Sequence, residues 1–267
     1  MLAAVVFVPS APLLVPEVAG PGAHDTDPVR RASLEAVTGV APGVDRWIAV
    51  GTADDPTPGL IAEPAYGTFA RFGVDVPVGV DVPVRVDAPV TGDGRTRGVT
   101  GRMSLSVLIA GWIAACASLG PVRVYSVGAA TTPADCLAIG ADLGAELVET
   151  SERIGVLVVG DGSTALTDKA PGGGRRESAV ALNSSIVAAV ASADTAALAE
   201  LDPHDCESEG VGGRPAWQVA AGIVGDQPVR PAVTFADAPF GVGYLVATWI
   251  ADSGTTGVDR SAGERLR

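Results

Sequence analysis

Few side chains in this 267-residue sequence can bind a metal ion or act as a base near neutral pH. The chain has two histidines and three cysteines: His24, His204, Cys116, Cys136 and Cys206. None of them has the CxxC, HxxxH or HExxH spacing that marks a zinc site. There is no GxSxG motif, and two histidines in predicted loops leave few possible bases for a Ser–His–Asp triad. The histidines and cysteines thus limit the chemistry available to this chain.

The segment 160–164, GDGST, is the sharpest candidate for a binding site. A small polar turn after a buried strand exposes backbone N–H groups and the Asp161 carboxylate at the edge of a sheet. A structural interpretation is also open, in which Asp161 and Ser163 cap neighbouring amides of a strand-to-loop turn. Composition alone favours the structural turn.

The loop 170–178, APGGGRRES, places two arginines after three glycines. An anion could bind Arg175, Arg176 and the first amides of the helix that follows. The spacing matches neither GxGxxG nor GxxxxGKS, so a mobile surface loop is favoured over a phosphate site.

Other polar clusters favour structural roles. The segment 201–209, LDPHDCESE, has ligand-type side chains, but consecutive residues on a short loop rarely converge on one ion, so a solvated connection between helices is favoured. For Asp54 and Asp55, adjacent positions on a loop indicate an Asp/Pro turn and not an acid–base pair. For His24, a position between glycine and aspartate residues predicts an exposed loop. A helix dipole could lower the pKa of Cys136, but its apolar neighbours favour a buried thiol.

Strands and helices are predicted to alternate around these candidates. Apolar runs predict strands at 2–8, 47–52, 122–129, 153–163, 230–238 and 240–250. Capping signals and periodicity predict helices at 28–38, 104–118, 133–149, 177–192, 194–201 and 215–224.

The order of these elements predicts an α/β fold with three layers, in which helices cover both faces of a mostly buried sheet. We expect one domain over 1–252 and a flexible tail over 253–267. Three prolines in 9–17 predict a non-helical turn, and alternating valine and proline in 74–90 predict edge strands or a hairpin. Ligands bind beyond the carboxyl ends of strands in such sheets, which points to the three turns at 9–16, 51–55 and 160–164.

Composition narrows the class of protein. Hydrophobic residues make up 47% of the chain and charged residues 18%, which excludes disorder for most of it. The net charge of −13 disfavours nucleic acid as a partner. We expect neither a signal peptide nor a membrane span, and three scattered cysteines favour reduced thiols in the cytoplasm. The partner is expected to be a small molecule or a protein, and the edges in 74–90 could support a homo-oligomer.

Four motifs in order resemble the LigB-like superfamily of class III extradiol ring-cleavage dioxygenases and their Memo-like relatives. They are VPSAPLLVPEV after the first strand, IAVGTADD, VLVVGDGST and APFGVGYLVA. Together they span about residues 2–250. The resemblance implies a non-haem Fe(II) held by two histidines and a glutamate, with a further histidine as acid and base.

The histidines that the resemblance implies are replaced here. Ser10 stands at the first ligand position, the strand ending at Thr52 has none nearby, and Thr164 follows the GDGS corner in place of the catalytic histidine. Where the resemblance implies the metal-binding glutamate, this sequence has Asp237, just before APFGVGY. Hydroxyl groups are poor Fe(II) ligands and cannot act as bases near neutral pH.

We therefore expect a LigB-like protein that has lost the Fe(II) site, does not cleave catechols, and binds a small molecule or has a regulatory role. No cofactor is expected, and the residues expected to line its cleft are Ser10, Pro12, Thr52, Asp54, Asp161, Ser163, Thr164 and Asp237. The alternative is an active metal-dependent enzyme with a shifted site, in which Asp161, Asp54 or Asp237 binds Mn²⁺ or Mg²⁺. A third possibility is a phosphate-ligand binder that uses Arg175 and Arg176.

Overall fold

A seven-stranded mixed sheet forms the centre of the chain, in a computed structural model that describes residues 1–81 and 102–252. Its strand order is β3-β6-β2-β7-β1-β9-β8. The inner strands β6, β2, β7 and β1 are parallel, whereas β3 at one edge and β9 and β8 at the other run antiparallel to their neighbours. The strands are β1 (Leu2–Val8), β2 (Arg46–Thr52), β3 (Leu60–Ile61), β6 (Arg123–Val127), β7 (Ile154–Val159), β8 (Val229–Asp237) and β9 (Tyr244–Ala251).

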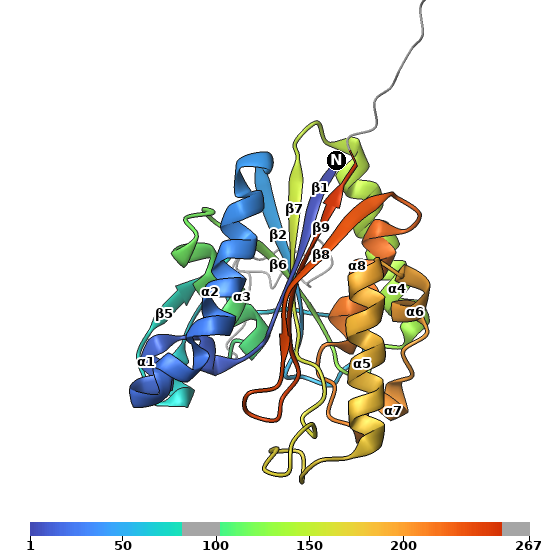
Figure 1. Ribbon diagram of the computed structural model, residues 1–267. Helices are drawn as coiled ribbons and strands as arrows, with labels where there is room; N and C mark the ends of the chain where they lie inside the picture. Colours follow the sequence, from blue (N-terminus) through green and yellow to red (C-terminus); the bar gives the residue numbers. More distant parts are fainter. Residues whose placement is uncertain (82–101, 253–267) are drawn as a thin grey trace, which may run out of the picture.

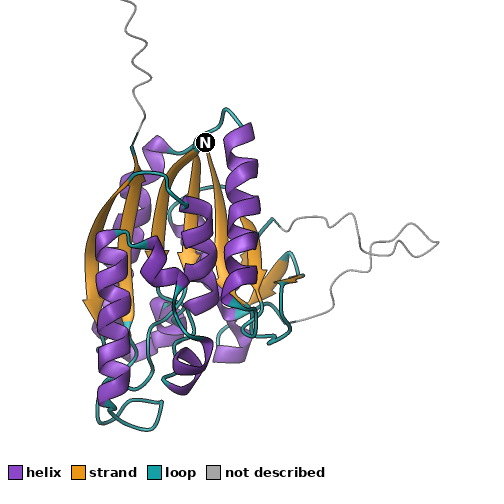
Figure 2. Ribbon diagram, turned by 90° about the vertical axis from the view of Figure 1, so that its right-hand side faces the viewer, coloured by secondary structure: helices purple, strands orange, loops and turns teal. Residues whose placement is uncertain are grey.

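Helices cover both faces of this sheet (Figure 1). On one face lie α1 (Pro16–Ala19), α2 (Ala23–Val40) and α3 (Leu105–Cys116). On the other face, which Figure 2 turns toward the viewer, lie α4 (Pro133–Glu149), α5 (Glu177–Ser192), α6 (Thr195–Ala199), α7 (Pro203–Ser208) and α8 (Arg214–Val224). The predicted three-layer α/β fold is confirmed.

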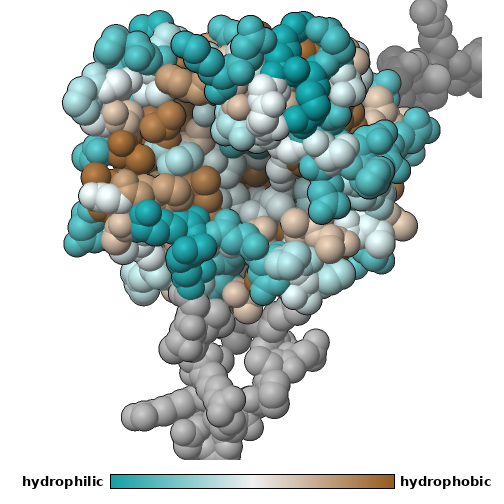
Figure 3. All heavy atoms as spheres, turned by 90° about the horizontal axis from the view of Figure 1, so that it is seen from below, coloured by the Kyte–Doolittle hydropathy of each residue, from teal (hydrophilic) through white to brown (hydrophobic). Residues whose placement is uncertain are grey.

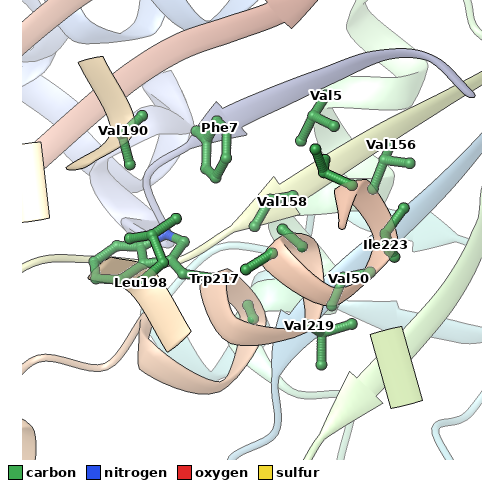
Figure 4. Packing of buried hydrophobic residues seen from close by; sticks show 14 of the residues in the cluster. Val5, Phe7, Val50, Val156, Val158, Val190, Leu198, Trp217, Val219 and Ile223 are labelled. Atoms are coloured by element: carbon green, nitrogen blue, oxygen red, sulfur yellow. The ribbon is translucent and has the colours of Figure 1, made fainter. Parts of the chain in front are cut away.

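The inner strands are apolar along most of their length because side chains on both faces of the sheet are buried under helices. Every residue of β7 is buried, as expected for a parallel strand with helices on both faces. Alternate side chains of β7 enter two different clusters: Val156 and Val158 contact the α4, α5 and α8 side, and Leu157 and Val159 contact the α2 and α3 side. Figure 4 shows the first cluster, which includes Trp217 and Val219 of α8 together with Val156 and Val158 of β7.

Local sequence signals set several helix boundaries. The predicted ranges of α4 and α5 match the structure residue for residue. Thr132 caps α4 by accepting a hydrogen bond from the Asp135 N–H, and Pro133 occupies the first helical position. Helix α3 is apolar all round and nine of its residues are buried, as predicted for 104–118.

Three predictions about short segments need correction. The prolines in 9–17 do not exclude helix, because Pro12 opens a 3₁₀ turn (Pro12–Leu14) and Pro16 opens α1 at the position that tolerates proline. The connection predicted at 201–209 contains α7, capped by Asp202. Helix α2 begins at Ala23, five residues before the predicted 28, and Pro28 lies inside it, where the helix gives up one backbone N–H donor.

The valine-rich segment 74–90 is only partly described. Its residues Pro77–Gly79 form β5, which pairs with β4 (Tyr66–Thr68) in a separate two-stranded ladder. Residues 82–90 of this segment and the predicted tail 253–267 lie outside the described residues. Within the described ranges, no helix is both long and apolar enough to cross a bilayer.

Candidate functional site

Four polar residues form a row across the carboxyl ends of the parallel strands. Ser10 follows β1. If the β1–β7 register is continued by two residues, Ser10 lies beside Asp161, which follows β7. If the β1–β9 register is continued by three residues, Ser10 lies beside Tyr244, at the start of β9. Asp237 pairs with Tyr244 in the next strand, β8. We call Asp161, Ser10, Tyr244 and Asp237 the polar row. Figure 3 looks onto this end of the molecule and shows its surface hollowed near the middle.

Asp161 is the residue of this row with the most unusual environment. Its Oδ1 accepts a hydrogen bond of 2.7 Å from the Ser10 N–H. Its Oδ2 has no hydrogen-bond partner among the described residues and is not fully enclosed. Burial raises the pKa of the Asp161 carboxyl from 3.8 to about 7, and the hydrogen bond from Ser10 opposes that rise only in part. The carboxyl therefore changes its protonation state near neutral pH.

Glycines on either side hold this carboxyl in place. A Cβ on Gly160 would lie 2.6 Å from the Cα of Gly213, so glycine lets the start of α8 approach the end of β7. The Gly213 N–H donates to the Asp161 carbonyl over 2.8 Å. A Cβ on Gly162 would lie 2.2 Å from Oδ1 of Asn183 in α5. The GDG sequence thus reflects close packing of backbone against two helices.

Tyr244 is the functional candidate that the sequence analysis missed. The residue is buried, and its phenol oxygen is not among the enclosed side-chain atoms that lack a partner in the described part of the chain. Burial, together with the nearby Asp161 charge, raises the pKa of the phenol. It therefore stays protonated throughout the range in which Asp161 titrates. The sequence signal was weak, because a tyrosine that opens an apolar strand is read as core.

The structure separates the other residues predicted to line a cleft. Ser163 is fully buried, and its hydroxyl donates to the Glu209 carbonyl over 2.6 Å and accepts from the Ala165 N–H. The Oγ1 of Thr164 packs in the space left by Gly172 and Gly210. Ser163 therefore has the turn-capping role that composition favoured, and the predicted cleft-lining role is wrong for its hydroxyl.

Thr52 and Pro12 also lie apart from Asp161. Thr52 shares its sheet face with Val50, which packs toward α8, whereas Asp161 follows the side chains that face α3. The Thr52 Oγ1 is buried and has no partner in the described part of the chain. Pro12 begins the 3₁₀ turn after Ser10 and supplies no polar side-chain group.

Asp54 and Asp55 fix the loop after β2. Asp54 accepts hydrogen bonds from Arg71 and from the Leu105 N–H at the start of α3. The Asp55 Oδ1 accepts from the Thr57 N–H over 2.8 Å, and this bond lowers the pKa of the Asp55 carboxyl. Both carboxylates are therefore used in local structure, in agreement with the Asp/Pro turn that the sequence favoured.

Arg176 is held by protein acceptors. Its Nε donates to Glu209 over 2.7 Å, one terminal nitrogen to the Gly172 carbonyl over 2.6 Å, and the other to the Ser208 carbonyl over 2.9 Å. Arg175 pairs with Glu177. An anion would have to displace these partners of Arg176, so the arrangement favours a loop-fixing role over a phosphate site.

The two histidines lie on helices away from the polar row, and two of the three cysteines are enclosed in the core. The His24 side chain is 76% exposed and pairs with Asp25 in the first turn of α2, and His204 is exposed in α7. Cys136 and Cys206 are buried in the core on the α8 side, and burial raises the pKa of each thiol to about 11. Neither thiol is a nucleophile near neutral pH.

The residues at this edge do not fit the iron site that the resemblance implies. The positions expected to hold imidazole hold Ser10, Thr52 and Thr164, and Asp237 is exposed with its Oδ1 accepting from the Ala238 N–H. Fe(II) sites of this type need two imidazoles and a carboxylate. In the described ranges, no three His, Cys, Asp or Glu side chains are grouped so that they could hold a metal ion, so Asp54, Asp161 and Asp237 do not form a shared oxygen site there.

Two larger grooves lie along α2, away from the polar row. One has a volume of about 400 Å³ and is lined by α2 alone. The other, of about 440 Å³, runs between α2 and the strands β8 and β9. Exposed side chains such as Arg31 and Glu35 line both grooves, and the partly buried Arg30, which pairs with Asp27, lines the first. The polar row is therefore the stronger candidate, although the grooves are better defined in shape.

Comparisons with known proteins identify the fold but not the family. No protein-family model matches the chain, and no curated protein matches it. The crystal structure of an uncharacterised protein of Escherichia coli K12, JW3007, is similar with a TM-score of 0.53 and 14% sequence identity. The alignment covers 93% of this chain and 99% of that protein. The likeness supports a shared α/β architecture over almost the whole length of both chains.

Proposed function

We propose that this chain is a LigB-like protein without an iron centre, and that it binds a small polar molecule over the polar row. The observation that carries the proposal is the Asp161 carboxyl, which follows the buried strand β7 and which the Ser10 N–H fixes through its Oδ1 over 2.7 Å. This partly buried carboxyl lies beyond the carboxyl end of a parallel strand, where ligands bind in open α/β sheets.

The donor chemistry supports binding in preference to iron-dependent ring cleavage. The polar row offers a carboxyl, a phenol and a hydroxyl from three adjacent strands, and these groups suit hydrogen bonds to a ligand. The side chains of both histidines are exposed, His24 on α2 and His204 on α7, so the acid–base imidazole of the family is also missing from this edge.

Two measurements test this proposal. The purified protein is loaded anaerobically with Fe(II) or Zn(II), and bound metal is measured together with turnover of catechol and protocatechuate. We expect neither stoichiometric metal nor ring cleavage. Separately, a library of neutral fragments is screened by NMR, and we expect ligands that shift the amide signals of Ser10, Gly162 and Gly243.

The results separate the candidate functions. Tight stoichiometric metal with ring cleavage would overturn the proposal. A rise in melting temperature with Mn²⁺ or Mg²⁺ and no ring cleavage would favour the shifted oxygen-ligand site instead, because a ligand selective for the folded state must stabilise it. Fragments that shift only signals from the α2 grooves would move the binding site there.

A further inference from the structure

Strand β8 leaves one edge of the central sheet open. Among the described residues it pairs with β9 alone, and it is the last strand in the order of the sheet. None of its nine residues is buried, and six of them are exposed. Alternate backbone N–H and C=O groups of an edge strand point away from its single neighbour, so β8 offers a row of these groups for pairing with another strand.

The sequence of β8 suits a short ladder. The six residues between Arg230 and Asp237, PAVTFA, carry no charge and include valine, threonine and phenylalanine, which favour strands. Lysine, which often blocks an exposed edge, is absent from β8. Pro231 removes one N–H donor, and a bulge between Val233 and Phe235 bends the strand. These two features limit the length of a ladder on this edge and disfavour an open-ended stack of strands.

Opposite charges at the two ends of β8 make this edge complementary to itself. The Arg230 side chain pairs with Asp252 of its own chain over 2.9 Å and is still 72% exposed, and Asp237 at the other end is also exposed. In an antiparallel pair of two β8 strands, Arg230 of each copy lies at the Asp237 end of the other. A parallel pair would bring like charges together. The charges therefore select the antiparallel orientation.

Helix α2 has the same kind of complementarity above this edge. It packs on β8 and β9, and Figure 1 shows β8 between α2 and α5. Arg31 and Glu35 lie one turn apart on α2, both side chains are 71% exposed, and both line the groove of about 440 Å³ that α2 forms with Phe235. Pairing two β8 strands would place the two β9 strands about 15 Å apart, which is three strand spacings. The α2 helices over them then lie close enough for Arg31 of one copy to approach Glu35 of the other.

We infer that this edge is a dimer interface, in which β8 pairs antiparallel with β8 of a second copy of the chain about a two-fold axis. The occupant is a second copy because the charges on both β8 and α2 match their own two-fold image. The opposite edge strand, β3, has only two residues, so head-to-tail pairing of copies has no strand of matching length. Pairing of β8 with itself therefore closes at two copies. This inference goes beyond the proposed function, because no ligand takes part in it.

Sedimentation equilibrium of the full chain, over a wide range of protein concentration, tests the inference. We expect a species of about 53 kDa at high concentration, which is twice the 26.7 kDa of one chain. Arg230→Asp and Asp237→Arg should each weaken the dimer by about tenfold or more, because each replaces two attractive contacts by two repulsive ones. A variant with both substitutions restores opposite charges in exchanged positions, so its dimer should regain nearly the wild-type affinity.

Matched controls make the same changes of charge away from β8. Arg46→Asp on β2 and Asp142→Arg on α4 alter exposed residues and should leave the dimer unchanged. Arg46 also gives up an ion pair, with Glu152, just as Arg230 gives up its pair with Asp252. In the wild-type protein, hydrogen exchange of the β8 amides should slow as the protein concentration rises. This measurement needs no variant, so it decides the question if a substitution prevents folding.

Several outcomes would overturn the inference. One is a protein that stays monomeric at every concentration. Another is a dimer whose affinity is the same in both single variants, because a different surface then holds it together. A doubly substituted protein that does not recover the dimer would contradict the pairing of Arg230 with Asp237. Protection of the β8 amides in a monomer would also overturn it, since another part of the same chain then covers the edge.

Discussion

Replacing Asp161 by asparagine should make the protein more stable at neutral and alkaline pH, although it removes a carboxyl from the candidate site. The pKa of Asp161 is about 7 in the folded chain, against 3.8 for an ordinary aspartate. Between these values the folded state binds more protons at this residue than the unfolded state does, so the free energy of unfolding falls as pH rises. The decrease in the free energy of unfolding that this residue causes is complete above pH 7, and it amounts to about 4 kcal/mol.

Between pH 5 and pH 8, where unfolding is easily measured, the expected change in the free energy of unfolding is smaller but measurable. From pH 5 to pH 8 the wild-type protein should lose about 2.5 kcal/mol relative to Asp161→Asn, whose amide has no charge to bury and keeps an oxygen for the Ser10 N–H. Urea unfolding of both proteins at each pH gives the difference between their free energies of unfolding. The contributions of the other titrating groups cancel in this difference. Asp226→Asn corrects for the loss of one negative charge. A difference that stays constant within 0.5 kcal/mol (about the measurement error) would refute the argument that Asp161 is buried in its neutral form.

Three further predictions concern other parts of the fold. Gly140→Ala should destabilise the protein by about 1–3 kcal/mol in urea unfolding, because the new Cβ would lie 2.2 Å from a backbone carbonyl of α8. A thiol reagent at pH 8 should titrate one cysteine faster than the other two in the native protein, and three equally fast thiols would contradict this. Cys116 is exposed, although desolvation and Glu17 raise the pKa of its thiol, whereas Cys136 and Cys206 are enclosed with pKa values of about 11. Arg176→Ala should raise the rate of hydrogen exchange in the loop 163–176, since three hydrogen bonds hold that loop to the protein, and unchanged exchange would contradict the loop-fixing role.

Much of the fold could be predicted because its signals are local and mutually consistent. The boundaries of α4 follow from a threonine cap, a proline at the first position and an acid in the first turn. The strand β7 is an uninterrupted apolar run, as parallel strands with two covered faces require. By contrast, α7 was predicted as a connection because its six residues are polar and too short to show periodicity.

The candidate site was harder to predict because its members depend on strand pairing. Asp161 could be singled out from the GDGST corner, and Ser10 from its turn. Their contact depends on the β1–β7 register, and the position of Tyr244 beside them depends on the antiparallel return of β9. No local pattern contains either fact. Ser163 was placed in the cleft for the same reason, since only the path of the loop to Glu209 shows that its hydroxyl points inward.

The position of the unusual carboxyl bears on the resemblance to the LigB-like superfamily. Active members of that family, as the resemblance implies, have a histidine at this edge that exchanges protons near neutral pH. An aspartate in water titrates too low for that task, but burial beside apolar strands moves the pKa of Asp161 to about 7, into the range of an imidazole. A chain without histidine at this edge therefore still has a group there that can hold or release a proton at physiological pH.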